Sequence, residues 1–314
     1  MITASAASGY RESSLLPQNK RPMSDPFNLA EVESVIAATS FAGHLHHLAT
    51  TPSTSDVALK AAQSGARNGV WIADKQIAGR GRGGHAWHSP AGAGLYMTVL
   101  TAPPIPMQSA LSLSFRVAIA AQSAICSVFG FERPAEIDIR WPNDLLLHGR
   151  KCGGILIDTA SNPATAAEPA QLRYAVIGIG INLNHTTFPP DLDPIATSLR
   201  RELPDHPAPR RESFTRSVEN GTKCLRREPL AAAILLALDR QLHALTESQP
   251  ATDNLQLATF SSWLQGKRVR VEVRDGNHGG YTGTTAGLNP QGFLLVAGDD
   301  GQLYTVLSGG LREP

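Results

Sequence analysis

A glycine- and arginine-rich stretch from Gln76 to Pro90, QIAGRGRGGHAWHSP, sets the first limit on the fold of this chain. It directly follows the apolar, strand-like run of residues 69–74, and no helix opens within it, so we expect a loop at the end of a strand. The small residues let backbone amides approach a ligand, while Arg80 and Arg82 supply fixed positive charge. The stretch therefore suits an anionic, phosphate-bearing ligand.

Two other kinds of segment have a similar composition. A Walker phosphate-binding loop is excluded, because no Gly-Lys-Ser/Thr follows the glycines. A flexible RGG-like segment that contacts RNA or only solvent stays open on these residues alone. Against RNA binding, the run is single and no aromatic-rich RNA-binding pattern accompanies it.

A second informative stretch runs from Arg140 to Leu156, RWPNDLLLHGRKCGGIL. A β run ends at Trp-Pro-Asn-Asp, a short apolar run turns at His-Gly, and Arg-Lys precedes Gly-Gly and another strand. This order predicts a hairpin with Lys151 at its inner end. A lone lysine is usually a solvated surface residue, but this one stands between a hairpin and a pair of glycines.

Helical and strand-like patterns mix along the chain, which predicts an α+β fold with a mixed sheet and flanking helices. Apolar residues at helical spacing predict helices over residues 55–64, 108–129 and 230–245. Strand-like runs occupy residues 69–74, 95–101, 136–141, 154–158 and 173–181.

Changes in composition divide the chain into three parts: residues 1–27, 28–265 and 266–314. The first part has no periodicity and is typical of a flexible leader. The middle part holds the motifs, with a proline-rich and then charged segment, 204–227, that we expect to be peripheral and in part an insertion, 212–227. The last part predicts a small antiparallel β-barrel, because turn signals separate short β runs at 268–273, 280–287, 292–296 and 302–307.

Charge and cysteine content limit the partners and the compartment. The chain has 28 Lys plus Arg against 27 Asp plus Glu, so no overall field favours nucleic acid or a membrane surface. The longest apolar stretch, residues 115–131, is interrupted by polar side chains, and no signal-like segment opens the chain. Cys126, Cys152 and Cys224 form neither a CxxC pair nor an even disulfide framework. We therefore expect a cytoplasmic protein that binds neither DNA nor membrane.

Four motifs, taken in order, give the chain a family resemblance. They are Ser-Thr at 53–54, QxAGRGRxGxxWxSP at 76–90, WPNDLxLxxRKxGGIL at 141–156 and GIGINLN at 178–184. In this order they resemble the catalytic core of biotin protein ligases over about residues 40–200, and the C-terminal β runs are similar to that family's end domain. The resemblance implies a class II synthetase-like core with a C-terminal SH3-like β-barrel.

The resemblance also implies an activity: ATP-dependent formation of biotinoyl-5'-AMP, then transfer of biotin to a lysine of a carboxylase's biotin carboxyl carrier domain. Activation joins two anions, so it needs cations but no protein nucleophile. The implied catalytic residues are Lys151, Arg80 and Arg82. Arg80 and Arg82 would lie along the biotin carboxylate and the phosphates, and Lys151 would bridge the carboxylate and the α-phosphate. Residues 79–86 would order over the intermediate, so shortening Arg82 is expected to let biotinoyl-AMP escape.

Biotin itself, an apolar chain with a ureido ring, needs a mostly apolar pocket with a few polar groups. Besides the three cations, the biotin-binding residues that the resemblance implies are Ser53, Thr54, Ser55, Gln76, Gly79, Gly81 and Gly154. Family members usually carry Asn and then Gln or Glu after Ser-Thr, whereas this chain has Ser55 and Asp56. Simple helix capping is the alternative role for Ser53 and Thr54.

The nucleotide side is expected to use oxygen-bearing and aromatic side chains. Asn143, Asp144 and Asn182 carry oxygens that suit Mg²⁺ or the nucleotide, and Asp144 and Asn182 are the predicted magnesium ligands. Asn and Asp at strand ends more often just close turns. Trp87 is expected to cover the nucleotide or else to lie in the core. With Arg82 and Lys151, these residues form the predicted ATP site.

Two further groups of residues favour structural roles. His44, His46 and His47 lie in an apparent β run without a second ligand group at zinc-like spacing, so they predict a strand and no zinc site. Cys152, beside Lys151, could suggest the acyl-thioester chemistry of related lipoyl- and octanoyl-transferring enzymes. A buried, inert cysteine is the preferred interpretation.

Rival functions follow from the same motifs. An enzyme that attaches lipoate or octanoate to a carrier lysine is the closest, and the Gly/Arg loop with Ser-Thr and Gln76 favours biotin over it. A biotin-responsive repressor would need an N-terminal winged helix, for which residues 1–45 are expected to be too short. The expected partners are ATP and the biotin carboxyl carrier protein, and the oligomeric state stays open between a monomer and a homodimer.

Overall fold

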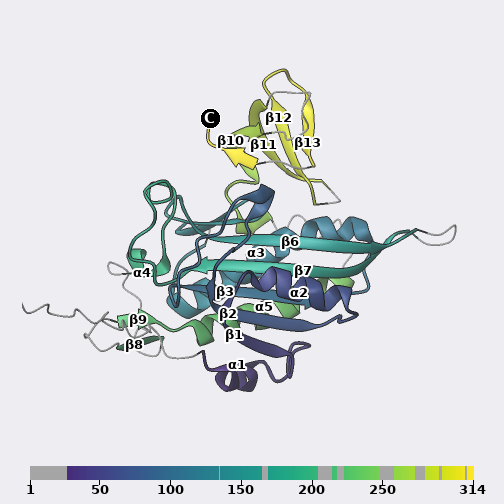
Figure 1. Ribbon diagram of the computed structural model, residues 1–314. Coiled ribbons are helices and arrows are strands. Elements are labelled where there is room, and N and C mark those ends of the chain that lie inside the picture. The colour runs from purple at the N-terminus through teal and green to yellow at the C-terminus, as the bar shows by residue number, and fades with distance from the viewer. Residues whose placement is uncertain are drawn as a thin grey trace, which may run out of the picture.

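The structure is a computed structural model that describes residues 27–133, 135–164, 169–203, 214–217, 223–247, 258–272, 280–289, 292–307 and 310–314. Its main element is a seven-stranded mixed sheet in the order β1-β2-β3-β7-β6-β5-β4 (Figure 1). Strands β1 and β2 are parallel, and the other neighbouring pairs are antiparallel. The strands are β1 (Leu45–Thr51), β2 (Gly69–Gln76), β3 (Gly94–Thr101), β4 (Ile137–Arg140), β5 (Asp144–Leu147), β6 (Arg150–Asn162) and β7 (Gln171–Asn182).

Helices cover both faces of this sheet. One face packs against α1 (Leu29–Ile36), α3 (Ala110–Phe129) and α5 (Arg227–Glu247), and the other against α2 (Thr54–Gln63). Side chains alternate accordingly along β2: Val70 and Ile72 join the large core, while Trp71 joins the small core under α2.

The long apolar helix α3 owes its composition to its place in the core. Among the described residues it is the one helix long and apolar enough to cross a membrane, with a mean hydropathy of 1.4 over Ser112–Phe129. Of that window, 72% is buried inside the protein, and the helix contacts α5 and strands β4 to β6. A core helix of a globular protein passes the same test of length and composition.

The C-terminal part forms a second, five-stranded antiparallel sheet in the order β13-β12-β11-β10-β14, drawn in yellow-green to yellow in Figure 1. Its strands are β10 (Gln265–Glu272), β11 (Tyr281–Leu288), β12 (Leu294–Gly298), β13 (Leu303–Val306) and β14 (Gly310–Arg312). The short helix η3 (Ala258–Phe260) leads into it. Buried Gln122 of α3 donates to the carbonyls of Ile137 (2.8 Å) and Phe260 (3.0 Å), so it ties this connection to the main sheet.

The predicted α+β fold with a small C-terminal β unit is confirmed, and most differences lie at element ends. Strand β6 begins at Arg150, before its apolar run, because the hairpin with β5 supplies backbone partners to its polar first residues. Helix α5 begins at Arg227, earlier than predicted, with Pro229 in the first turn, where proline is tolerated.

Two predicted segments fall mostly on residues that the structure does not describe. Of the predicted leader, only Phe27 is described; it is 5% exposed and stacks on His47. Of the peripheral segment, β8 (Thr215–Ser217) and β9 (Lys223–Leu225) are described and pair as an antiparallel two-stranded sheet, which the sequence did not predict.

Candidate active site

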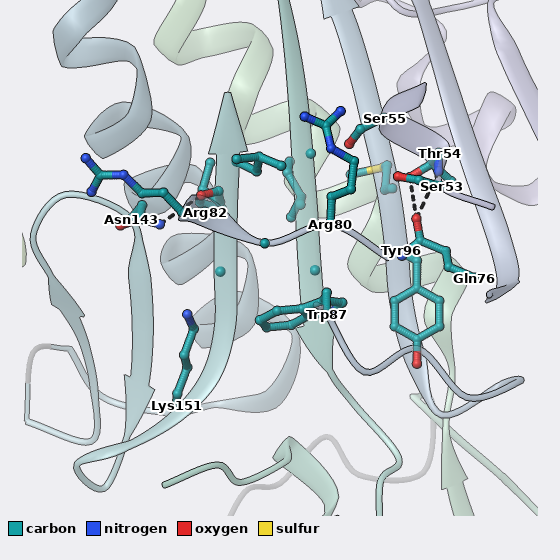
Figure 2. A pocket seen from close by; sticks show the side chains of 18 residues that line it. Ser53, Thr54, Ser55, Gln76, Arg80, Arg82, Trp87, Tyr96, Asn143 and Lys151 are labelled. Carbon is teal, nitrogen blue, oxygen red and sulfur yellow. Dashed lines mark hydrogen bonds between the residues drawn. The ribbon is translucent and has the colours of Figure 1, made fainter. Parts of the chain in front are cut away.

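An inner pocket lies between the N-terminus of α2 and strands β2, β3, β6 and β7, beneath the Gly/Arg loop (Figure 2). It gathers every residue predicted to bind biotin except Gly79, which lines the wider cleft next to it. The lining residues are Ser53, Thr54, Ser55, Gln76, Arg80, Gly81, Arg82, Trp87, Tyr96, Met97, Asn143, Lys151, Gly154, Ile155, Leu156, Gly178, Ile179 and Gly180.

Hydroxyl and amide groups concentrate at one end of this pocket. The Gln76 Oε1 atom accepts from the Thr54 backbone N–H (2.9 Å) and the Thr54 hydroxyl (3.1 Å), while its Nε2 donates to Ser89 (3.0 Å). The Thr98 hydroxyl lies 2.8 Å from that of Thr54 and 3.2 Å from that of Ser55. This arrangement of donors and acceptors suits a polar ring such as a ureido group. Thr98 was not predicted, because a lone threonine in a buried strand carries no sequence signal.

Ser53 occupies the N-cap position of α2, but its side chain makes no capping hydrogen bond. The residue is 1% exposed and lines the pocket. The capping interpretation is therefore wrong for the Ser53 side chain, and its hydroxyl faces the site instead.

The Gly/Arg loop folds back on itself at the end of β2, as predicted. The Gly81 N–H donates to the His85 carbonyl (2.7 Å) and the Trp87 N–H to the Gly79 carbonyl (2.8 Å). At its tip, the short helix η1 (Arg82–Gly84) contains Gly83 with φ 69°, a left-handed conformation that favours glycine. In the structure the stretch is therefore a folded loop over a pocket.

Trp87 packs its indole into the pocket against two glycines of neighbouring strands. A Cβ atom at Gly180 would lie 2.6 Å from the indole Nε1, and one at Gly154 would lie 3.2 Å from its Cζ3. Glycine at these positions therefore makes room for Trp87. Gly154, which the resemblance implies for biotin binding, lines the inner pocket and also leaves room for the side chains of Trp87 and Lys151.

Lys151 is the second residue of β6, just after the turn of the predicted hairpin, where His148 and Gly149 have φ values of 47° and 78°. Its Nζ lies 2.6 Å from Asp144 Oδ1, and its ammonium group is 5.5 Å from the centre of the Trp87 ring. Arg140 donates to the other Asp144 oxygen at 2.7 Å. Burial raises the pKa of Asp144, but the charges of Lys151 and Arg140 outweigh it, so the pKa lies below its ordinary value of 3.8.

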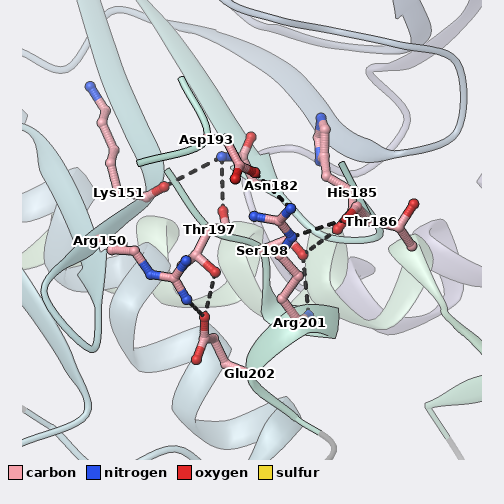
Figure 3. Close-up of polar contacts among 10 residues, drawn as sticks. All are labelled: Arg150, Lys151, Asn182, His185, Thr186, Asp193, Thr197, Ser198, Arg201 and Glu202. Carbon is pink, nitrogen blue, oxygen red and sulfur yellow. Dashed lines mark hydrogen bonds and ion pairs between the residues drawn. The ribbon is translucent and has the colours of Figure 1, made fainter. Parts of the chain in front are cut away.

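The backbone of Lys151 is held by a distant segment of the chain (Figure 3). Its N–H donates to the Ile195 carbonyl, and its carbonyl accepts from the Thr197 N–H, both at 2.9 Å. The Asn182 amide donates to the Thr197 carbonyl at 3.1 Å. Glu202 Oε1 accepts from Arg150 and from the Thr197 hydroxyl, each at 2.5 Å. No sequence motif marked Thr197 or Glu202, because these contacts join positions far apart in the chain.

A wider cleft adjoins the inner pocket and extends to the C-terminal sheet, where Glu272 and residues 310–312 line it. Both spaces share the residues Gln76, Gly81, Arg82, Trp87, Asn143 and Lys151. Two cations, Arg82 and Lys151, thus stand at the junction, where a carboxylate from the inner pocket would meet an anion in the cleft.

Asn143 and Arg80, which the resemblance places at the ligands, also have partners within the protein. The Asn143 amide donates to the Ile155 carbonyl at 2.9 Å and so supports the hairpin. Arg80 lines the inner pocket, but its guanidinium pairs with Asp56 (3.0 Å) and Asp158 (3.2 Å). It lies beside Ser55, on the opposite side of the pocket from Lys151 (Figure 2).

The remaining candidate side chains occupy structural positions. His46 and His47 lie on β1, where His46 stacks on Trp71 (5.3 Å between ring centres) and His47 pairs with Asp74 (3.0 Å), which confirms the predicted strand. Cys152 is fully buried, as predicted, and burial raises the pKa of its thiol to about 12, which disfavours the reactive thiolate.

Comparisons with known proteins place these motifs in one family. The sequence profile of the Biotin/lipoate A/B protein ligase family matches residues 48–182. The biotin--[acetyl-CoA-carboxylase] ligase of Mycobacterium tuberculosis is 30% identical over 296 residues, which cover 92% of this chain and 95% of that protein. The bifunctional ligase/repressor BirA of Bacillus spizizenii is 36% identical over 196 residues, 61% of this chain, and the match spans only 57% of that relative.

Solved structures share the fold. The biotin protein ligase of Aquifex aeolicus in complex with biotin and ATP superposes with a TM-score of 0.64 at 21% identity, covering 87% of this chain and 100% of that one. The Leishmania major biotin protein ligase in complex with biotinyl-5-AMP gives a TM-score of 0.52 at 23% identity, over 85% and 99% of the two chains. With the near full-length match to the mycobacterial ligase, the chain belongs to the biotin protein ligase family.

Proposed function

We propose that this chain activates biotin with ATP to biotinoyl-5'-AMP and then transfers biotin to a lysine of a carboxylase's biotin carboxyl carrier domain. The observation that carries the proposal is the junction of two binding spaces at Lys151 and Arg82. One space is narrow, with hydroxyl and amide groups at its end, and the other is wide enough for a nucleotide.

In the first step, a carboxylate oxygen of biotin attacks the α-phosphorus of ATP, and pyrophosphate leaves with the electron pair of the broken P–O bond. Negative charge gathers where the two anions meet, so cations fixed there stabilise the transition state more than the separated substrates. Lys151 is suited to this role because Asp144 and the backbone contacts of residues 195 and 197 hold it in place.

In the second step, the carrier lysine amine attacks the acyl carbon, loses a proton, and AMP leaves. The mixed anhydride has to be kept from water until the amine arrives. The Gly/Arg loop and the Trp87 ring cover the pocket on the side of the wide cleft, and we propose that they provide this shielding.

The magnesium that accompanies ATP is not given a ready-made site by this chain. Asp144 is already paired with Arg140 and Lys151, and the Asn182 amide donates to a backbone carbonyl. Within the described ranges, no group of three or more His, Cys, Asp and Glu side chains could hold a metal ion. The carboxylate of Asp144 is thus already paired with two cations, and we propose that the ion is held mainly by the nucleotide's phosphates and water.

The test is incubation of the purified chain with biotin, Mg-ATP and a biotin carrier domain, with lysine modification scored by mass. We expect one biotin added per carrier and a loss of about 100-fold or more in rate for Lys151→Ala, since a cation at the developing charge is removed. Lys267→Ala is a matched control, because Lys267 is about equally exposed (34% against 33%), also pairs with a carboxylate, and lines neither the inner pocket nor the wide cleft.

Parallel reactions with lipoate and octanoate distinguish a biotin ligase from an enzyme that attaches lipoate or octanoate to a carrier lysine. The contacts of Gln76 and Thr54 favour a ligand with a polar ring, and therefore biotin. Transfer of lipoate or octanoate without transfer of biotin would overturn the proposal. A cytoplasmic location and the absence of DNA binding are proposed alongside it. The oligomeric state stays open between a monomer and a homodimer.

A further inference from the structure

Arg80 occupies an unusual place for an arginine next to a binding site for anions. Its two terminal nitrogens are each paired with a carboxylate: Nη1 with Asp56 at 3.0 Å, and Nη2 with Asp158 at 3.2 Å. Both terminal nitrogens therefore have a carboxylate partner within the protein. The Asp56 position is also one where this chain departs from the usual sequence of its family.

The two aspartates belong to the two walls of the inner pocket. Asp56 lies in the first turn of α2, and Asp158 lies on β6, where it pairs with Val176 of β7. Arg80 itself belongs to the Gly/Arg loop, opposite Ala86 in a short antiparallel bridge. The arginine therefore joins the loop to both walls at once, on the side of the pocket marked by Ser55 (Figure 2).

Backbone hydrogen bonds fix only the base of the loop to the pocket, where the N–H groups of residues 77 and 78 donate to the carbonyls of residues 51 (3.0 Å) and 52 (2.9 Å). Further along, the bonds from Gly81 to His85 and from Trp87 to Gly79 close the loop on itself. Two side chains attach this outer part to the pocket. Trp87 packs against Gly180 and Gly154, and Arg80 reaches the aspartates.

We propose that Arg80 is a positioning residue: through Asp56 and Asp158 it fastens the Gly/Arg loop across the inner pocket and keeps the acyl adenylate bound until the carrier lysine arrives. The retention of the acyl adenylate rests on the proposed function. The contacts that fasten the loop do not, because Arg80 pairs with the two aspartates in the protein without ligands.

The first test measures the loop directly, in full-length protein without ligands. Asp56→Asn and Asp158→Asn each remove one carboxylate charge and keep the side-chain shape. Because the three side chains are 33–41% exposed, each pair is weak, and we expect hydrogen–deuterium exchange over residues 77–90 to speed up by about 1.5- to fivefold. Asp299→Asn, which breaks the exposed pair with Arg268 in the C-terminal sheet, is the control and should leave this segment unchanged. Exchange at the wild-type rate in both aspartate variants would overturn the proposal.

The second test uses a ratio that a merely destabilised enzyme would not alter. AMP formed per carrier biotinylated does not depend on the fraction of active protein, but it rises when biotinoyl-AMP escapes and is hydrolysed. We expect this ratio to rise at least about threefold for Asp56→Asn and Asp158→Asn. Asp56→Glu keeps the carboxylate and should restore the wild-type ratio.

The alternative is that Arg80 leaves the aspartates to bind the biotin carboxylate. Removing a carboxylate would then free the arginine, tighten biotin binding and leave the ratio unchanged, which would overturn the proposal. If wild-type protein forms no biotinoyl-AMP, the proposed function fails, and the exchange measurement alone decides whether Arg80 fastens the loop.

Discussion

At the scale of single residues, the site depends on charges that are balanced before any substrate binds. Asp144 lies between Lys151 and Arg140, and its carboxylate holds the Lys151 ammonium at the junction of the two binding spaces. The same logic applies to Arg80 between its aspartates. Each cation is therefore positioned by an acidic neighbour, which limits the side-chain freedom that substrate binding would otherwise have to remove.

Replacing Asp144 by Asn tests this balance. At pH 7 we expect the free energy of unfolding to fall by about 1–3 kcal/mol, because two cations lose their partner. The folded-state pKa of Asp144 is below its ordinary value of 3.8, so its contribution is complete above that pH and is lost as the pH falls through the lower folded value. Urea unfolding at pH 7 and pH 3 measures this. A difference between wild type and variant that does not shrink in acid would contradict the assignment.

At the scale of elements, the turn of the β5–β6 hairpin determines where strand β6 begins and therefore where Lys151 lies. Its two-residue turn puts both His148 and Gly149 in the left-handed region. Glycine adopts a positive φ without steric cost. Histidine is found at positive φ less often than asparagine. His148 is therefore not the residue that this turn conformation favours most.

Substitutions at His148 should follow that preference. The side chain is exposed, and the backbone N–H donates to the Glu136 carbonyl in any variant. We expect His148→Val to lower the free energy of unfolding by about 1–2 kcal/mol, because a β-branched side chain is strained at positive φ. His148→Asn should match or exceed the wild type. Chemical denaturation measures the free energy of unfolding of the two variants. Equal values would show that the turn changes its conformation to suit the residue.

At the scale of the whole molecule, the C-terminal sheet is joined to the catalytic sheet through buried polar contacts. Gln122 reaches both Ile137 of β4 and Phe260 at the entry to the second sheet. Ser261 donates to the Ile139 carbonyl at 2.5 Å. The joint matters for the site because residues 310–312 of the second sheet line the wide cleft.

Gln122→Leu should loosen this joint, because the buried Ile137 carbonyl loses its donor at a cost of about 1–3 kcal/mol and the partly buried Phe260 carbonyl loses its link to α3. We expect faster hydrogen–deuterium exchange over residues 258–272 and a lower unfolding free energy. Ser127→Ala, at an exposed position on the same helix, is a suitable control. Exchange over 258–272 that matches the control would argue that the joint is held elsewhere.

Local chemistry explains what the sequence by itself could predict. The loop after β2, the hairpin before Lys151 and the Ser-Thr and Gln76 positions follow from glycines, turn residues and apolar runs that are contiguous in the chain. Strand and helix ends were less accurate, since partners elsewhere in the sheet extended β6 beyond its apolar run.

Only the tertiary structure decided which partner each of these residues has. The chain shows Arg80 beside glycines but not that Asp56 and Asp158 pair with it, and it shows Gly180 in a strand but not the Trp87 ring that fills the space above it. The segment that holds the Lys151 backbone comes from residues 195–197. Such contacts join positions far apart in the sequence, and the free energy that selects them comes from burial and charge pairing in the folded protein, which a local pattern does not contain.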